Sequence, residues 1–112
     1  MSLFIASLNS GSNGNCYYIG NAHEAVLIDA GISCRETERR MLRLGLSIRK
    51  VRAIFISHEH SDHINGVPVL SRKYQLPVYV TAATRQSCGL AVSDDLAFPF
   101  APFETLPSVN YP

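Results

Sequence analysis

The chain has 112 residues, of which 46% are hydrophobic and 17% are charged, with ten Lys and Arg residues against nine Asp and Glu residues. This composition excludes a disordered or fibrous protein, and a net charge of +1 excludes attraction of polyanions through bulk charge alone. The three cysteines, Cys16, Cys34 and Cys88, contain no Cys-x-x-Cys pair, which predicts free thiols and excludes a disulfide framework.

The first quarter of the chain predicts three antiparallel strands, at residues 3–8, 16–19 and 24–28. A loop rich in Ser, Gly and Asn, residues 9–15, separates the first two strands, and Gly20-Asn21 forms a turn between the second and third.

From residue 24 onward strands and helices alternate, which predicts an α/β fold (α+β in some classifications). Ser33 and Glu36 form a capping box that begins a helix, and Gly45 ends this helix after about Leu44. Apolar and small residues recur at helical spacing in it and predict a stripe that faces the core: Cys34, Thr37, Met41 and Leu44.

The second half continues this alternation. We expect a buried strand over 51–57, a helix over 64–74 with Pro68 in its first turn, a strand over 76–80 and a helix from Thr81 to Cys88. Residues 91–112 contain four of the six prolines and predict no helix or strand.

Three of the four histidines lie within six residues, 58–63, directly after the predicted strand over 51–57. Because side chains at i and i+2 share a side of an extended segment, His58 and His60 can converge, while the turn into the next helix brings Asp62 and His63 round from another direction. Imidazole and carboxylate ligands suit Zn²⁺, with Mn²⁺ or Fe as alternatives. The segment therefore predicts two divalent ions close together that activate water for hydrolysis, against the alternative of a surface histidine cluster.

Three segments resemble a known family. The pattern His-x-His-x-Asp-His at 58–63 and the strand end Leu27-Ile28-Asp29-Ala30-Gly31 resemble metallo-β-lactamase-fold hydrolases. The segments 10–17 and 72–79 are similar to the YycJ/WalJ-like branch of that family.

The resemblance implies a four-layer αβ/βα sandwich, of which residues 1–112 would be the amino-terminal part of a single domain, or its first half. It implies that His58 and His60 bind one metal ion and that Asp62 and His63 bind a second, with Asp62 as the catalytic residue. It also implies that Asp29 orients the histidine loop.

The loop before the second strand is a candidate phosphate-binding loop, because its backbone N–H groups could face an anion; a plain hairpin turn is the alternative. Its residues are Ser10, Gly11, Ser12, Asn13, Gly14 and Asn15.

His60 stands where redox members of the family carry glutamate, so the resemblance implies hydrolysis. The branch implies a nucleic acid substrate and a 5′-to-3′ DNA exonuclease. The alternatives are a thioester, lactone or β-lactam hydrolase of the same fold, or an incomplete fragment that acts as a binding module.

No histidine follows His63, so we expect the remaining ligands of such a site to lie downstream of this chain. A half domain would leave a sheet edge and an apolar surface uncovered, which predicts association with another molecule, including a second copy of the chain. The amino terminus lacks the features of a signal peptide, and we expect a cytoplasmic protein with no membrane association.

Overall fold

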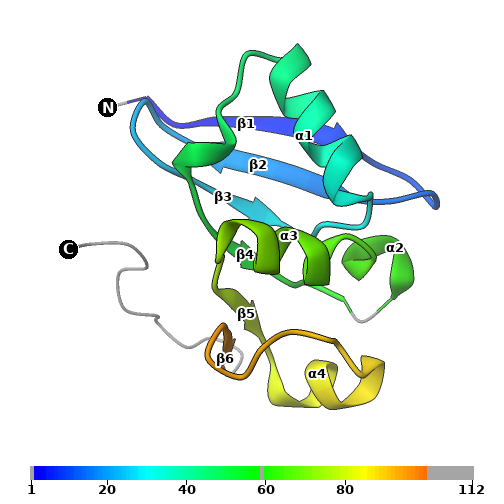
Figure 1. The fold of residues 1–112 in the computed structure, drawn as a ribbon. Coiled ribbons are helices and arrows are strands. Elements are labelled where there is room, and N and C mark those ends of the chain that lie inside the picture. Colours follow the sequence, from blue (N-terminus) through cyan, green and yellow to red (C-terminus); the bar gives the residue numbers. More distant parts are fainter. Residues whose placement is uncertain (1, 59, 101–112) are drawn as a thin grey trace.

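The structure of the chain is a computed structural model that describes residues 2–58 and 60–100 (Figure 1). Strands and helices alternate from β3 onward. In chain order the elements are β1 (Phe4–Asn9), β2 (Cys16–Gly20), β3 (Ala25–Ile28), α1 (Cys34–Arg43), the 3₁₀ turn η1 (Ile48–Lys50), β4 (Val51–Phe55), α2 (Ser61–Ile64), α3 (Val67–Tyr74), β5 (Val78–Val80), α4 (Ala82–Cys88) and β6 (Ala97–Pro99).

The six strands form one mixed sheet in the order β1-β2-β3-β4-β5-β6. The first three strands are antiparallel neighbours, which confirms the predicted meander, and β4, β5 and β6 add in parallel. Helices connect the parallel strands, because a parallel pair cannot be joined by a tight turn. The predicted α/β class is confirmed.

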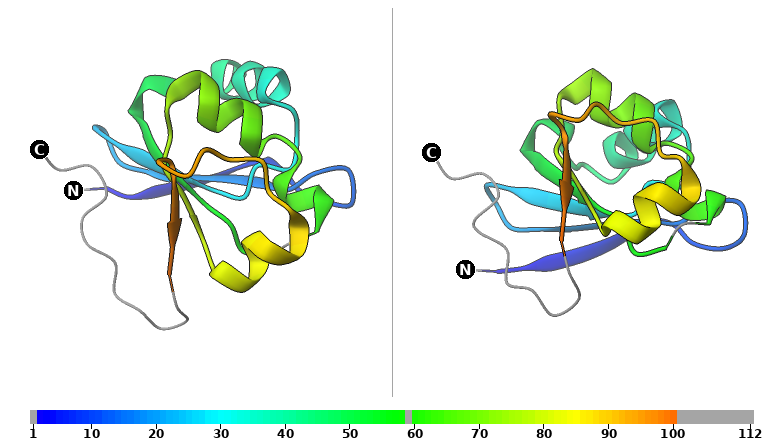
Figure 2. Two further views of the ribbon diagram at one scale, coloured as in Figure 1. Left: turned by 60° about the horizontal axis from the view of Figure 1, so that its bottom comes forward. Right: turned by 90° about the horizontal axis from the view of Figure 1, so that it is seen from below.

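Helices α1 and α3 lie side by side over one face of the sheet (Figure 2). Ser33 caps α1 by accepting a hydrogen bond from the backbone N–H of Glu36, and Thr37 and Met41 are buried beneath the helix. The prediction that Leu44 belongs to the core stripe is wrong, since its side chain is 53% exposed. Leu44 is the C-cap, where the backbone leaves the helix, so its side chain no longer follows the inward stripe.

The single helix predicted over 64–74 is instead two helices, α2 and α3, separated at Asn65-Gly66. The backbone N–H of Gly66 donates to the carbonyl of Ala30, at 2.7 Å, and Gly66 lies against the chain that follows β3. Pro68 lies in the first turn of α3, where its missing N–H costs nothing.

The prediction that residues 91–112 contain no strand is wrong for β6, which pairs in parallel with β5. Pro99 is compatible with this strand because β6 lies at the edge of the described sheet. The rest of the predicted proline-rich tail, residues 101–112, lies outside the described residues.

On the sheet face turned away from α1 and α3, the side chains of Phe55 and Tyr79 are partly buried and that of Phe98 is exposed. Neighbouring aromatic rings stack across β4, β5 and β6, with ring centroids 4.8 Å apart for Phe55 and Tyr79 and 5.5 Å apart for Tyr79 and Phe98. The described residues therefore supply one sheet and one helical layer, which are two layers of the predicted four-layer sandwich. Within residues 2–58 and 60–100, no helix has the length and apolar character needed to cross a membrane.

Candidate metal centre

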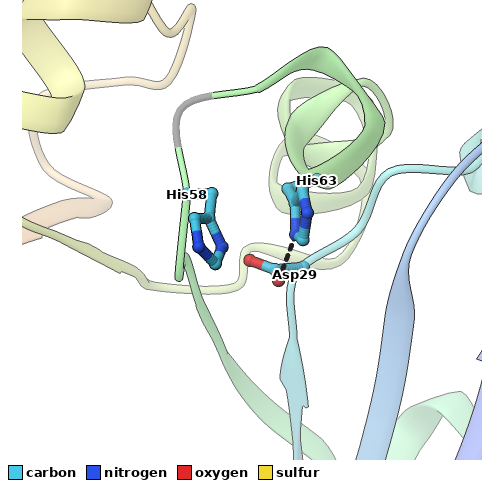
Figure 3. Close-up of side chains that lie close together, drawn as sticks. All are labelled: Asp29, His58 and His63. Atoms are coloured by element: carbon cyan, nitrogen blue, oxygen red, sulfur yellow. Dashed lines mark hydrogen bonds and ion pairs between the residues drawn. The ribbon is translucent and has the colours of Figure 1, made fainter. Parts of the chain in front are cut away.

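The candidate site lies where the parallel strands β3 and β4 end at the same edge of the sheet. The chain leaves β3 at Asp29 and leaves β4 toward Ser57 and His58, and α2 then brings His63 back to the same place. Figure 3 shows the side chains of Asp29, His58 and His63 converging there from these three segments.

Backbone contacts hold the segment after β3 against α2. The N–H of Ala30 donates to the carbonyl of His63, at 2.9 Å. Gly31 passes so close to α2 that a Cβ atom at this position would lie 1.8 Å from the carbonyl oxygen of Asp62. Only glycine fits this approach, so the Asp29-Ala30-Gly31 sequence serves to place α2 and its side chains.

Asp29 is 2% exposed and has a φ of 63°, a conformation that Asp and Asn adopt more readily than most residues. Its Oδ1 accepts from the backbone N–H of Ser57, at 2.7 Å. Its Oδ2 accepts from the hydroxyl of Ser57, at 2.5 Å, and lies 2.6 Å from Nδ1 of His63. A carboxylate has only acceptor sites when ionised, so this buried group is satisfied by three surrounding donors.

The hydrogen-bond network assigns the tautomers of two histidines. The Ser57 hydroxyl donates its one hydrogen to Asp29. The Ser57 oxygen can therefore only accept from Nδ1–H of His58, 2.9 Å away. His63 likewise donates from Nδ1 to Asp29. In both neutral rings the lone pair is then on Nε2, the form of imidazole that binds a metal ion.

Among the predicted ligands, the structure brings His58 and His63 close together and leaves His60 farther from His58. The His58 and His63 ring centroids are 4.7 Å apart, whereas those of His58 and His60 are 6.1 Å apart. Oδ2 of Asp62 lies 3.7 Å from Nε2 of His63, and ligand atoms of Asp29, His58 and His63 all lie within 4.8 Å of one another. His60 is exposed, and it lies outside that three-residue group.

These residues fit a divalent metal ion. Two imidazoles with their lone pairs on Nε2 and a partly exposed carboxylate form the mixed nitrogen and oxygen donor set that Zn²⁺, Mn²⁺ and Fe²⁺ accept. Asp29 differs from them, because its oxygens are already engaged by Ser57 and His63.

The loop over 9–15 is a turn that hydrogen-bonds mainly to itself. The N–H of Gly14 donates to the carbonyl of Gly11, at 3.2 Å, and the Asn9 amide donates to the carbonyl of Gly14, at 2.6 Å. Gly11 and Gly14 have φ values of 119° and 139°, which explains the two glycines of this loop without a ligand. Asn15 reaches beyond the loop to α2.

Cys16, directly after this loop, is fully buried. Burial, together with the nearby charge of Asp29, raises the pKa of its thiol to about 12. A buried thiol with a raised pKa is typical of a structural cysteine and not of a reactive one. All three cysteines are free, as predicted.

Sequence reasoning assigned no role to Ser57, which connects Asp29 to His58. The sequence does contain a feature that points to this residue: Ser57 carries a hydroxyl group directly before the first histidine of the motif, at the end of a buried strand. Only the fold shows that the end of β3 places a carboxylate within reach of this hydroxyl.

Comparison with known proteins gives a consistent result. Residues 10–106 match the family model described as the metallo-beta-lactamase superfamily. The chain is 46% identical over 84 residues to exodeoxyribonuclease YycJ of Bacillus anthracis, covering 75% of this chain and 32% of that protein. It is 40% identical over 80 residues to exodeoxyribonuclease WalJ of Streptococcus pneumoniae, covering 71% of this chain and 30% of that protein.

A solved structure of a B3 metallo-β-lactamase with an active-site glutamic acid superposes with a TM-score of 0.74 at 19% identity. The match covers 94% of this chain and 46% of that one. The chain thus spans about a third of the length of the two exodeoxyribonucleases that it resembles.

Proposed function

Because the chain belongs to the metallo-β-lactamase superfamily, we propose that the complete protein is a metal-dependent phosphodiesterase that degrades DNA from a 5′ end. The observation that carries the proposal is the pair of histidines, His58 after β4 and His63 in α2, each with its lone pair on Nε2, in a chain that resembles exodeoxyribonucleases. The likeness to β-lactamases concerns the fold alone and does not favour a β-lactam substrate.

We assign the ligands as follows. His58 and His60 would hold one divalent ion, and Asp62 and His63 would hold a second. Zinc is the first choice because imidazole dominates this set, with manganese or iron as alternatives. Further ligands would come from residues outside this sequence, since residues 1–112 would form the amino-terminal part of one domain.

When bound, two such ions polarise a phosphoryl oxygen and lower the pKa of water, which supplies a nucleophile at neutral pH. The protein groups described here do the positioning. Asp29 fixes the ring of His63 directly and the ring of His58 through Ser57, so both rings present the same nitrogen to the site. Asp62 would be the catalytic carboxylate, because it is partly exposed at the start of α2 and lies beside His63.

We also propose that the protein acts in the cytoplasm, where its DNA substrate would be found. The candidate phosphate loop over 9–15 would then lie beside the site and contact the substrate through its exposed tip, Ser12 and Asn13.

The proposal is tested with the complete protein, loaded with Zn²⁺ or Mn²⁺, on linear duplex DNA that carries a 5′ phosphate. We expect mononucleotides or short products that appear from the 5′ end, and loss of cleavage after dialysis against a chelator. Replacement of His58 or Asp62 by alanine should lower the cleavage rate by about 10³-fold or more, because each removes part of the site that stabilises the transition state.

The matched control is His23→Ala, because His23 is exposed in the turn between β2 and β3. This variant should cleave at the rate of the unmodified protein. Hydrolysis of thioesters or β-lactams without cleavage of DNA would overturn the nuclease proposal and favour the alternative hydrolase.

A further inference from the structure

Asn15 connects the loop over 9–15 with the start of α2, although it lies 47 positions before Asp62. Its backbone N–H donates to the carbonyl of Asp62, at 2.6 Å, and its carbonyl accepts from the N–H of Gly31, at 2.9 Å. The backbone of Asn15 is therefore held between the two segments that form the candidate metal centre.

The side chain of Asn15 continues this link. Its Nδ2 lies 3.0 Å from the carbonyl of Gly11, 3.3 Å from the carbonyl of Asp62 and 3.1 Å from Oδ2 of Asp62. Its Oδ1 accepts from the N–H of Gly11, at 3.2 Å. These partners fix the orientation of the amide, because the Gly11 N–H requires an acceptor and the three oxygens require a donor.

An amide NH₂ group has two hydrogens, and this geometry uses both. One points to Gly11, and the other is shared between the carbonyl and the carboxylate of Asp62. The same Nδ2 lies 3.5 Å from Nε2 of His63, on the side where that ring carries its lone pair. Asn15 thus contacts a carboxylate and an imidazole that we assign to the same ion.

We propose that Asn15 is a positioning residue that holds the Asp62 carboxylate in its metal-binding orientation, and not part of a phosphate-binding loop. This inference rests on the proposed function. The side chain of Asp62 is 29% exposed. Asp62 lies in the single turn of α2, and so short a helix does not by itself fix the rotamer of this side chain. A donor from a different segment restricts that freedom, and the oxygen that it contacts, Oδ2, is the one that lies 3.7 Å from Nε2 of His63.

The same contacts argue against phosphate binding by Asn15. A phosphate needs free donors, whereas the backbone N–H and both side-chain hydrogens of Asn15 already have oxygen acceptors within this fold.

The experiment compares Zn²⁺ affinity, by competition with a chromophoric chelator, in the unmodified complete protein and in Asn15→Ala and Asn15→Asp. We expect affinity to fall 10- to 100-fold in Asn15→Ala, the range found when groups that orient metal ligands are removed. Asn15→Asp should lose at least as much, because it keeps the shape and the acceptor for Gly11 but places a carboxylate beside that of Asp62. Asn65→Ala is the matched control, an exposed asparagine directly after α2, and should not change affinity.

The visible absorption spectrum of the Co²⁺-loaded protein separates positioning from a structural role of the loop. At saturating Co²⁺ we expect altered band positions or intensities in both Asn15 variants and an unchanged spectrum in Asn65→Ala. If Asn15→Ala does not fold, as judged by circular dichroism, the isosteric Asn15→Asp carries both measurements.

Affinity within twofold of the unmodified protein, or weaker affinity with an unchanged Co²⁺ spectrum, would overturn the positioning role and leave the proposed function intact. An unmodified protein that binds no divalent ion would overturn the proposed function and this inference together.

Discussion

Asp29 and His63 are 34 positions apart in the chain, yet a carboxylate oxygen of Asp29 lies 2.6 Å from Nδ1 of His63. The same oxygen accepts from Ser57, so one buried carboxylate sets the orientation of two imidazole rings.

Replacement of Asp29 by asparagine should weaken Zn²⁺ binding 10- to 100-fold. Asparagine tolerates the φ of 63°, so the backbone is expected to stay in place. However, the NH₂ group of asparagine would face one of the donors that Ser57 and His63 direct at Asp29. That donor would lose its acceptor, which lowers the free energy of unfolding by about 1–3 kcal/mol. Chelator competition and urea unfolding measure the two effects. Asp94→Asn is the control, since its carboxylate is 96% exposed, and a loss as large in this variant would refute the explanation.

In Ser57→Ala, His58 should no longer be held in a single tautomer. Without the hydroxyl, Nδ1 of this ring loses the acceptor 2.9 Å away, and the proton can occupy either nitrogen. Long-range ¹⁵N–¹H correlation spectra should show His58 with the proton on Nδ1 in the unmodified protein and a mixture in the variant. His63 should keep its tautomer because its bond to Asp29 is direct. The exposed Ser93→Ala serves as the control, and an unchanged His58 spectrum in Ser57→Ala would contradict the assignment.

Gly31→Ala should destabilise the protein by roughly 3 kcal/mol or more and abolish metal binding, because the new Cβ would lie 1.8 Å from the Asp62 carbonyl oxygen. Neither segment can move away without breaking the backbone bond between Ala30 and His63. Gly45→Ala is the matched control: nothing lies within 4 Å of its Cβ, and only its φ of 75° adds a cost of about 1 kcal/mol. Equal thermal midpoints for the two variants would refute the steric account.

The contact between α1 and α3 should make stability depend on pH in the acid range. Hydrogen bonds from Lys73 and Tyr74 lower the pKa of Glu38 below the ordinary value of 4.5. A carboxylate with a lowered pKa contributes stability above its unfolded pKa, and this contribution disappears as the pH falls through the folded pKa. We expect Glu38→Gln to lose less than about 1 kcal/mol at pH 7, because the group is near the surface, and we expect this loss to shrink as the pH falls below the ordinary pKa of 4.5. Urea unfolding at a series of pH values measures this, and a loss that does not change with pH would contradict the electrostatic explanation.

Local signals in the sequence predicted the elements whose ends are fixed by their own residues. Ser33 and Thr81 cap α1 and α4 through their side chains, and Gly45 and Gly89 end them with positive φ values. The metal motif was visible because its histidines are close together in the chain.

Features that depend on distant segments were missed or misplaced. β6 forms only because β5 offers a parallel partner, which no local pattern of its proline-containing segment indicates. The break between α2 and α3 is set by Gly66 against Ala30, and the role of Ser57 depends on a carboxylate 28 positions earlier. The contact of Asn15 with Asp62 could not be predicted from the sequence, because the fold brings together two residues that are 47 positions apart.

The contact of Ala30 with both His63 and Gly66 has a consequence for folding kinetics. These bonds join residues 33 and 36 positions apart in the chain, and contacts between distant segments form slowly during folding. Ion capture in a refolding experiment would therefore report when the segments of the candidate centre have come together. An ion that binds only the assembled form would also stabilise the whole sheet against unfolding.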